Sequence, residues 1–224
     1  MLLGFSKHPR AAAAVVLVAV FMTNLDLLIV NVALPAMGED FSAGGGAAGL
    51  GSLSWVLNAY AITFAALLVV AGRAGDRIGQ RPVFLAGIAV FTLASLGCAL
   101  APNLGTLIVA RVVQAVGASA QIPTSLALLL AAVPTERRTQ ATRGWAGVGG
   151  LAAAAGPVAG GLLTEVDWRW VFAVNLPIGI AALVVGRSAL PKPAARETGP
   201  LPDLLGALLV IVSIASLAGA LVQA

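Results

Sequence analysis

The sequence predicts an all-α integral membrane protein, and three observations support that fold class. Hydrophobic residues make up 59% of the 224 residues, charged residues only 10%, and the mean hydropathy is +0.99. Soluble domains carry about 45–50% apolar and about 25% charged residues, so this composition excludes a water-soluble domain and also a disordered chain. The apolar residues also fall into runs long enough to cross the hydrocarbon as helices, which takes about 20 residues. These runs are too uniformly apolar for the alternating strands of a membrane β-barrel.

Seven such runs follow one another, and each is expected to be a membrane-spanning helix. The connections are short, except for a Gly-rich segment at 42–49 and a Pro-rich one within 188–203. The first six spans are expected to form one helical bundle over residues 1–187, and two triplets of opposite topology are one arrangement that fits six spans. The Pro-rich linker then leads to a seventh transmembrane helix within 204–224. The expected spans are 11–35, 50–71, 82–101, 104–127, 144–163, 170–186 and 204–222.

Basic residues predict the orientation of these spans. If the N-terminus is cytoplasmic, the inner side holds all Lys and Arg except Arg169, which is outside, and Arg111, which is within a span. Acidic residues such as Asp40 and Asp167 fall in the outer loops. This asymmetry explains the net charge of +4 without a nucleic-acid partner. Arg far outnumbers Lys, and both Ala and Gly are abundant. From this composition and the spans we expect a multi-pass protein of a bacterial cytoplasmic membrane.

Two charged residues inside spans are candidates for chemistry. Asp26 in the first span and Arg111 in the fourth both lie about 10–14 Å below the outer surface, at 1.5 Å per helical residue. A charge at that depth is costly, so each should face a cavity or a partner. We therefore expect Asp26 and Arg111 to pair, and burial and the neighbouring Arg should compete over protonation of the carboxyl. The alternative is a shifted first span that places Asp26 at the membrane interface.

A polar stripe continues from Arg111 along the fourth span. Gln114, Gln121 and Ser125 recur at three- and four-residue spacing and so share one helix face. Such a face should line the bundle interior or a water-filled path, although polar contact between helices is the alternative. We expect Gln114 to take part in proton or substrate coupling, and Gln121 and Ser125 to line the substrate path.

The connection between the second and third spans carries a Gly-flanked acid–base pair. The pair is Asp76 and Arg77, and the residues of the whole motif are Gly72, Asp76, Arg77, Gly79 and Arg81. A tight turn with positive-inside arginines is the simpler interpretation, whereas Asp and Arg side chains that bind helix ends would make a structured latch.

This connection resembles the signature of the major facilitator superfamily, G-x-L-A-D-R-x-G-R-[RK]. Ala74 stands where Leu is usual and Gln80 where a basic residue is usual. The resemblance implies that the loop controls the interchange of outward- and inward-facing states. The missing basic residue is expected to weaken that latch.

Three further stretches resemble the fourteen-span drug:proton antiporters of that superfamily. The first-span motif runs from Leu25 through Asn31 to Pro35, and the fourth-span motif spans 111–117. The sixth-span motif begins at Trp168 and includes Asn175. By this resemblance Asn31 is expected to line the substrate path.

The fifth span contains the stretch that resembles the exporter motif of this group. It comprises Gly156, Pro157, Gly160 and Gly161. Small residues four apart favour close helix packing, and Pro157 is expected to kink the helix. A smooth, bendable helix could let two halves slide or could block a proton leak, and both possibilities stay open.

The expected function is proton-coupled export of small, drug-like or amphipathic molecules by alternating access. The partners are then the lipid bilayer, the substrate and protons, with the proton gradient as energy source and no cofactor or metal. A single histidine and a single cysteine, with no hydrolase or metalloprotease motif, argue against a membrane enzyme. Because the superfamily builds its path between two six-helix halves, seven spans suggest an N-terminal half that lacks its C-terminal half. The alternative is a truncated, non-transporting remnant, or a half-transporter that needs a second chain.

Overall fold

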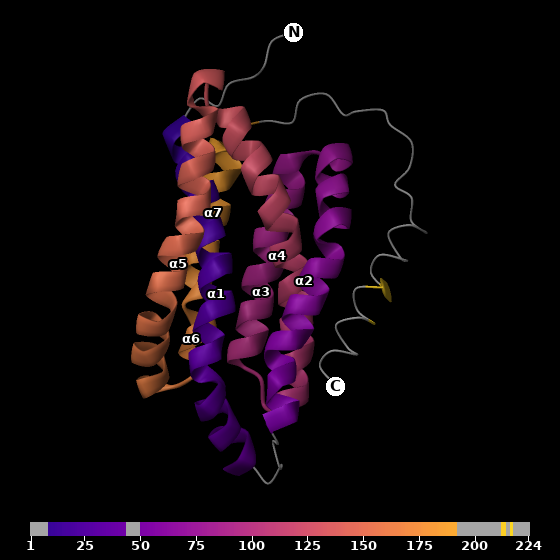
Figure 1. The fold of residues 1–224 in the computed structure, drawn as a ribbon, viewed down its shortest axis with the longest axis vertical. Coiled ribbons are helices and arrows are strands. Elements are labelled where there is room, and N and C mark those ends of the chain that lie inside the picture. The colour runs from indigo at the N-terminus through magenta and orange to yellow at the C-terminus, as the bar shows by residue number, and fades with distance from the viewer. Residues whose placement is uncertain (1–8, 44–49, 192–211, 214–215, 217–224) are drawn as a thin grey trace.

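The structure is a computed structural model that describes residues 9–43, 50–191, 212–213 and 216. Within these ranges the chain contains six helical segments long and apolar enough to cross a membrane (Figure 1). The predicted all-helical fold is confirmed for the first six spans. The predicted seventh span, 204–222, falls almost wholly outside the described residues, and the division into domains stays a prediction. The helices are α1 (Pro9–Ala43), α2 (Leu50–Ile78), α3 (Gln80–Ala99), α4 (Leu104–Ala132), α5 (Arg138–Val166), α6 (Trp170–Ala173) and α7 (Asn175–Ala189).

Helix α1 extends further than the apolar run predicts. It continues past Pro35 to Ala43, and its 35 residues are about 52 Å long, compared with about 30 Å of hydrocarbon. Asp40 stabilises this extension because its Oδ2 accepts hydrogen bonds from Trp168 and Arg169, both at 3.0 Å. Phe41 adds an edge-to-face contact with Trp168 at 5.4 Å between ring centroids. The predicted end at Pro35 was wrong because these contacts hold the outer end of the helix.

A one-residue interruption at Val174 separates α6 from α7, although Val174 keeps helical backbone angles and its N donates to Trp170 O at 3.0 Å. Pro177 has no backbone N–H and therefore cannot bond to the carbonyl of Ala173, which weakens the helix at this point. The short α6 is held instead by the turn that precedes it, where Val171 N donates to Trp168 O at 3.1 Å. The span thus contains a junction close to its outer end.

The two triplets exchange their leading helices. Helix α4 packs mainly against α2 and α3 of the first triplet, while α1 packs mainly against α5 and α7 of the second. Figure 1 shows α1 beside α5 and α4 beside α2. Helices α1 and α4 also contact each other, so they form the centre of the bundle. The opposite topology of the two triplets stays a prediction.

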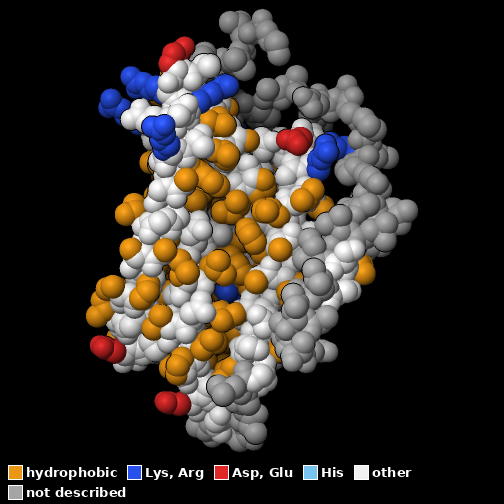
Figure 2. Space-filling model, in the orientation of Figure 1, with side chains coloured by type: hydrophobic (Ala, Val, Ile, Leu, Met, Phe, Trp, Pro, Cys, Tyr) orange, Lys and Arg blue, Asp and Glu red, His pale blue; other side chains and the backbone are white. Residues whose placement is uncertain are grey.

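The bundle has an apolar middle and charged ends (Figure 2). Apolar side chains cover its length, and basic side chains gather at the end where α4 meets α5. That end includes Arg137, Arg138 and Arg143, whereas Asp40 and Asp167 belong to the opposite end. A helical bundle with this distribution of surface residues fits a bilayer, with its charges in the headgroup regions.

Candidate functional site

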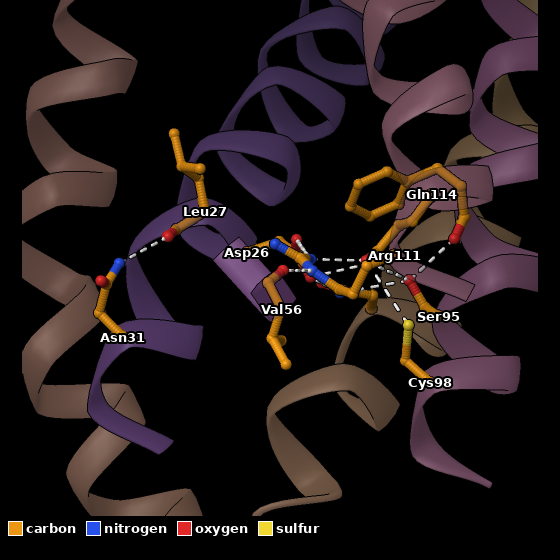
Figure 3. Close-up of polar contacts among 10 residues, drawn as sticks. Asp26, Leu27, Asn31, Val56, Ser95, Cys98, Arg111 and Gln114 are labelled. Atoms are coloured by element: carbon orange, nitrogen blue, oxygen red, sulfur yellow. Dashed lines mark hydrogen bonds and ion pairs between the residues drawn. The ribbon is translucent and has the colours of Figure 1, made fainter. Parts of the chain in front are cut away.

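Asp26 and Arg111 form an ion pair in the interior of the bundle (Figure 3). NH1 of Arg111 lies 2.5 Å from Oδ2 of Asp26, and both side chains are fully buried. The pair joins α1 to α4, the leading helices of the two triplets. A buried charge is destabilising unless it is paired and hydrogen-bonded, so this contact is what permits both residues at this depth. Asp26 is thus buried among the helices and is not exposed at the surface of the bundle.

Two amide side chains hold the other carboxylate oxygen of Asp26. Gln114 Nε2 and Asn175 Nδ2 each donate to Oδ1 at 2.9 Å. Gln114 is itself fixed, because its Oε1 accepts from Arg111 NH1 at 2.6 Å. Ser95 Oγ on α3 accepts from both amides, at 2.8 Å from Gln114 and 3.4 Å from Asn175. The carboxylate is therefore enclosed by donors from α4 and α7.

The guanidinium of Arg111 is held on its other sides by α2 and α6. Its Nε donates to the carbonyl of Val56 at 3.2 Å. Its central carbon lies 4.1 Å from the ring centroid of Tyr60 and 5.7 Å from that of Phe172. Contacts between a desolvated cation and an aromatic face contribute about 2 kcal/mol or more. Arg111 is thus stabilised by the aromatic rings as well as by Asp26.

Asp26 and Arg111 each have several partners at this site. The ionised form of Asp26 has a guanidinium and two amide donors as partners. When the carboxyl is neutral, Arg111 keeps the oxygen of Gln114, the carbonyl of Val56 and the face of Tyr60. The guanidinium of Arg111 therefore has partners that do not depend on Asp26.

Sequence reasoning assigned no role to Asn175, Ser95 or Tyr60. Asn175 could have been found, because it is the one amide in the apolar run 170–186. Ser95 and Tyr60 carry no comparable signal, since a hydroxyl group in a membrane span most often bonds to its own helix. Ser95 does so as well, and its Oγ donates to the carbonyl of Phe91 at 2.8 Å.

The predicted path-lining residues lie outside this cluster. Asn31 is exposed, and its Nδ2 donates to the carbonyl of Leu27 on its own helix at 3.0 Å (Figure 3). Gln121 and Ser125 are fully buried and link helices: Thr23 donates to Gln121 Oε1 at 3.3 Å, and Trp145 donates to Ser125 Oγ at 2.9 Å. These contacts agree with the helix-linking alternative for Gln121 and Ser125. The path-lining role of all three residues stays a prediction.

The Gly-flanked connection is mostly helical. Helix α2 continues through Gly72, Asp76 and Arg77, so that Gly79 alone separates it from α3. Helix α2 thus extends to Ile78, beyond the predicted end at 71, whereas α3 begins at Gln80, close to the predicted start at 82, and Gly79 lies between them. Its φ of 113° reverses the chain within one residue, in a region that residues with a Cβ rarely adopt.

The polar side chains of this connection bind neighbouring helix ends. Gln80 Nε2 donates to Asp76 Oδ1 at 2.9 Å, so Gln80 partners the acid at the position where a basic residue was expected. Arg81 donates to the carbonyl of Arg187 in the last turn of α7. A cation at a helix C-terminus is stabilised by the helix dipole. Arg81 therefore ties the start of the third span to the end of the sixth.

Part of the glycine motif in α5 packs closely against α1. A Cβ at Gly156 would lie 2.9 Å from Leu28 Cβ, and one at Gly160 would lie 2.9 Å from Val32 Cβ. A Cβ at Gly161 would meet nothing within 4 Å, and Pro157 is exposed within the helix. Gly156 and Gly160 thus allow close approach of α5 to α1, whereas Gly161 has no such role among the described contacts.

A bundle of six membrane-length helices around a buried acid–base pair defines a polytopic membrane protein with an ionisable centre. Residues 16–223 match the family model of the Major Facilitator Superfamily. The chain belongs to the major facilitator superfamily.

Several curated relatives resemble the chain over most of its length. It is 37% identical over 188 residues to an uncharacterized MFS-type transporter, Rv1250, of Mycobacterium tuberculosis, covering 84% of this chain and 32% of the relative. It is 35% identical over 222 residues to the tetracenomycin C resistance and export protein of Streptomyces glaucescens, covering 99% and 40%. It is 38% identical over 204 residues to the methylenomycin A resistance protein of Streptomyces coelicolor, covering 90% and 42%. The chain therefore spans about a third to two-fifths of the length of these relatives.

Proposed function

We propose that this chain forms the N-terminal half of a proton-coupled exporter of small, drug-like or amphipathic molecules. The transporter works by alternating access across a bacterial cytoplasmic membrane, with the N-terminus in the cytoplasm. The buried Asp26–Arg111 pair carries the proposal. Ionisable residues inside a membrane bundle mark ion or substrate pathways because their burial has no structural benefit. Asp26 is the proton carrier, and Arg111 and Gln114 set its surroundings.

The cargo class is supported by the names of the relatives. Two of them are an export protein and a resistance protein for antibiotics. The energy source is the proton gradient, because Asp26 provides a group that exchanges protons and no cofactor is needed for that exchange. The basic end of the bundle, with Arg137, Arg138 and Arg143, lies on the cytoplasmic side by the positive-inside rule.

The alternative is a half-transporter that needs a second chain, and the length of the relatives favours this alternative. The chain corresponds to 32–42% of the relatives reported above. A path between two halves then requires six further spans, supplied by the same gene product or by another one. If neither supplies them, the chain is a membrane remnant without transport.

Inverted membrane vesicles test the proposal and the alternative together. Cells produce the full chain alone or with a second-half polypeptide, and ethidium serves as the amphipathic fluorescent probe. An imposed proton gradient is expected to drive ethidium accumulation in the vesicles, and a protonophore abolishes it. Asp26→Asn is expected to remove the driven accumulation, whereas Glu136→Gln, which neutralises an exposed acid in the connection before α5, keeps most of it.

The outcomes separate the candidates. Accumulation only with the second half supports the proposed N-terminal half, and accumulation by the chain alone contradicts its assignment to one half. If ethidium accumulates in neither case, the result supports a membrane remnant without transport. Unchanged accumulation by the Asp26→Asn protein shows that Asp26 does not carry the coupled proton.

A further inference from the structure

We propose that Asn175 is a positioning residue that links the charge of Asp26 to the junction between α6 and α7. With Asp26 ionised, Asn175 holds the sixth span against the first. With Asp26 neutral, that hold weakens and the junction loosens. The inference rests on the proposed function only in assuming that Asp26 changes its charge during transport.

The contact between Asn175 and Asp26 depends on a close approach of α7 to its neighbours. The buried face of α7 consists of Asn175, Gly179, Ala182 and Gly186, at helical spacing. A Cβ at Gly179 would lie 1.9 Å from Thr92 Oγ1 on α3, so only glycine permits this packing distance. The short Asn175 side chain, one turn earlier on the same face, reaches Asp26 for that reason. It is 1% exposed.

Asn175 responds to the charge of Asp26 more than Gln114 does. Gln114 has partners that do not depend on Asp26, namely Arg111 NH1 at 2.6 Å and Ser95 Oγ at 2.8 Å. Asn175 has its 2.9 Å bond to Asp26 and a longer one, 3.4 Å, to Ser95. Because a bond to a carboxylate is about twice as strong as one to a neutral group, neutralising Asp26 removes most of what holds Asn175.

The position of Asn175 places this change at a weak point of the backbone. It is the first residue of α7, directly after Val174, and Pro177 leaves the carbonyl of Ala173 without its usual helical donor. A side-chain bond at this junction therefore replaces stability that the backbone does not supply. Loss of that bond should speed amide exchange first at the junction rather than along the whole span.

The charged and titratable groups around Asp26 come from three helices. Arg111 extends from α4, Tyr60 from α2 and Cys98 from α3, where Cys98 Sγ contacts Gln114 Oε1 at 3.8 Å. Of these, only Arg111 bonds directly to Asp26 among the described residues. In the described residues, Asn175 connects the sixth span to the carboxylate of Asp26 through its hydrogen bond to Oδ1.

Hydrogen–deuterium exchange of the full chain in lipid nanodiscs tests the link without requiring transport. Asn175→Val and Asn175→Thr are matched variants, because the two side chains have the same shape and only Thr can donate and accept. Asp26→Asn mimics the neutral carboxyl, and Asp76→Asn is the control acid far from α6. All variants are compared at one pH, with circular dichroism as the check on folding.

We expect Asp26→Asn and Asn175→Val each to speed exchange at residues 170–180 by about five- to tenfold, which is the loss of a charge-assisted bond. Asn175→Thr should restore much of the protection, and Asp76→Asn should leave this segment unchanged. The double variant Asp26→Asn/Asn175→Val should exchange no faster than the faster single variant, because both remove the same contact.

Two results overturn the inference: unchanged exchange at 170–180 in Asp26→Asn, or equal acceleration by the Thr and Val variants. If Asn175→Val does not fold, Asp26→Asn alone decides, because it retains Asn175. The proposed function fails separately. If Asp26→Asn loosens the junction but still drives ethidium accumulation, the link stands and the proton role does not.

Discussion

Arg111 is stabilised by every kind of contact that a buried cation can make. It pairs with Asp26, donates to the oxygen of Gln114 and to a backbone carbonyl, and lies over the ring of Tyr60. Its NH2 nitrogen nevertheless has no hydrogen-bond partner among the described residues. Removal of Arg111 would leave Asp26 without a counter-ion, whereas Arg111 has further partners in Gln114, Val56 and Tyr60.

Arg111→Met should lower the free energy of unfolding by about 3–5 kcal/mol, because Asp26 is then a buried charge without its counter-ion. Thermal unfolding in detergent measures the change. Arg169→Met is the matched control, since its pair with Asp40 is partly exposed, with 34% and 43% side-chain exposure, and contributes about 1 kcal/mol or less. Equal losses in the two variants would contradict the assigned burial of the central pair.

Tyr60→Phe should be nearly neutral, whereas Tyr60→Leu should destabilise the protein by about 1–2 kcal/mol, because the aromatic face over the guanidinium is lost. Unfolding in detergent again provides the measurement. A Phe variant as unstable as the Leu variant would mean that the hydroxyl, and not the ring, matters at this position.

At the scale of the helices, glycines determine which elements come close. Gly156 and Gly160 bring α5 against α1, and Gly179 brings α7 against α3. The small residues of the fifth span are visible in the sequence, but their partners are not. Gly160 and Gly161 are neighbours with opposite surroundings, and only the packing of α1 distinguishes them.

Gly160→Val should destabilise the bundle by about 1–3 kcal/mol, because the new side chain overlaps Val32 on α1. Gly161→Val is the control, since its Cβ position is open. Unfolding of both variants in the same detergent is compared. The account of α1–α5 packing is wrong if the two variants lose the same stability.

Gly79→Ala should lower stability by about 1–3 kcal/mol, because Ala must adopt a φ of 113°. Gly144→Ala, in the open first part of α5, should instead be neutral or slightly stabilising because Ala favours helix. Thermal unfolding distinguishes the two. A harmless Gly79→Ala substitution would show that the α2–α3 connection does not need this backbone conformation.

The sequence was sufficient for the spans but not for their ends. Apolar runs predict where a chain crosses the hydrocarbon, because transfer of side chains from water dominates there. They say nothing about helices that continue into water, such as α1 beyond Pro35, which is held by Asp40 and Trp168. The Asp26–Arg111 contact could be predicted because two opposite charges at one depth have few other partners. Asn175 was missed because its partner is set by the approach of α7.

The whole molecule combines two exchanged triplets around one ionisable centre. Because α1 packs with the second triplet and α4 with the first, the ion pair lies where the triplets meet. A change in its charge can therefore reach both triplets through directly bonded residues. The proposed transporter uses this position for the coupled proton.

The central claim is that Asp26 gains and loses the transported proton. A measurement of the proton flux that accompanies substrate movement tests this claim most directly. The full chain with its second half is reconstituted in lightly buffered proteoliposomes, and ethidium addition is followed with a pH-sensitive dye. The account predicts an ethidium-linked proton flux that Asp26→Asn abolishes and that Asp40→Asn retains, since Asp40 lies at the outer end of α1. An Asp26→Asn protein with an undiminished flux would contradict it.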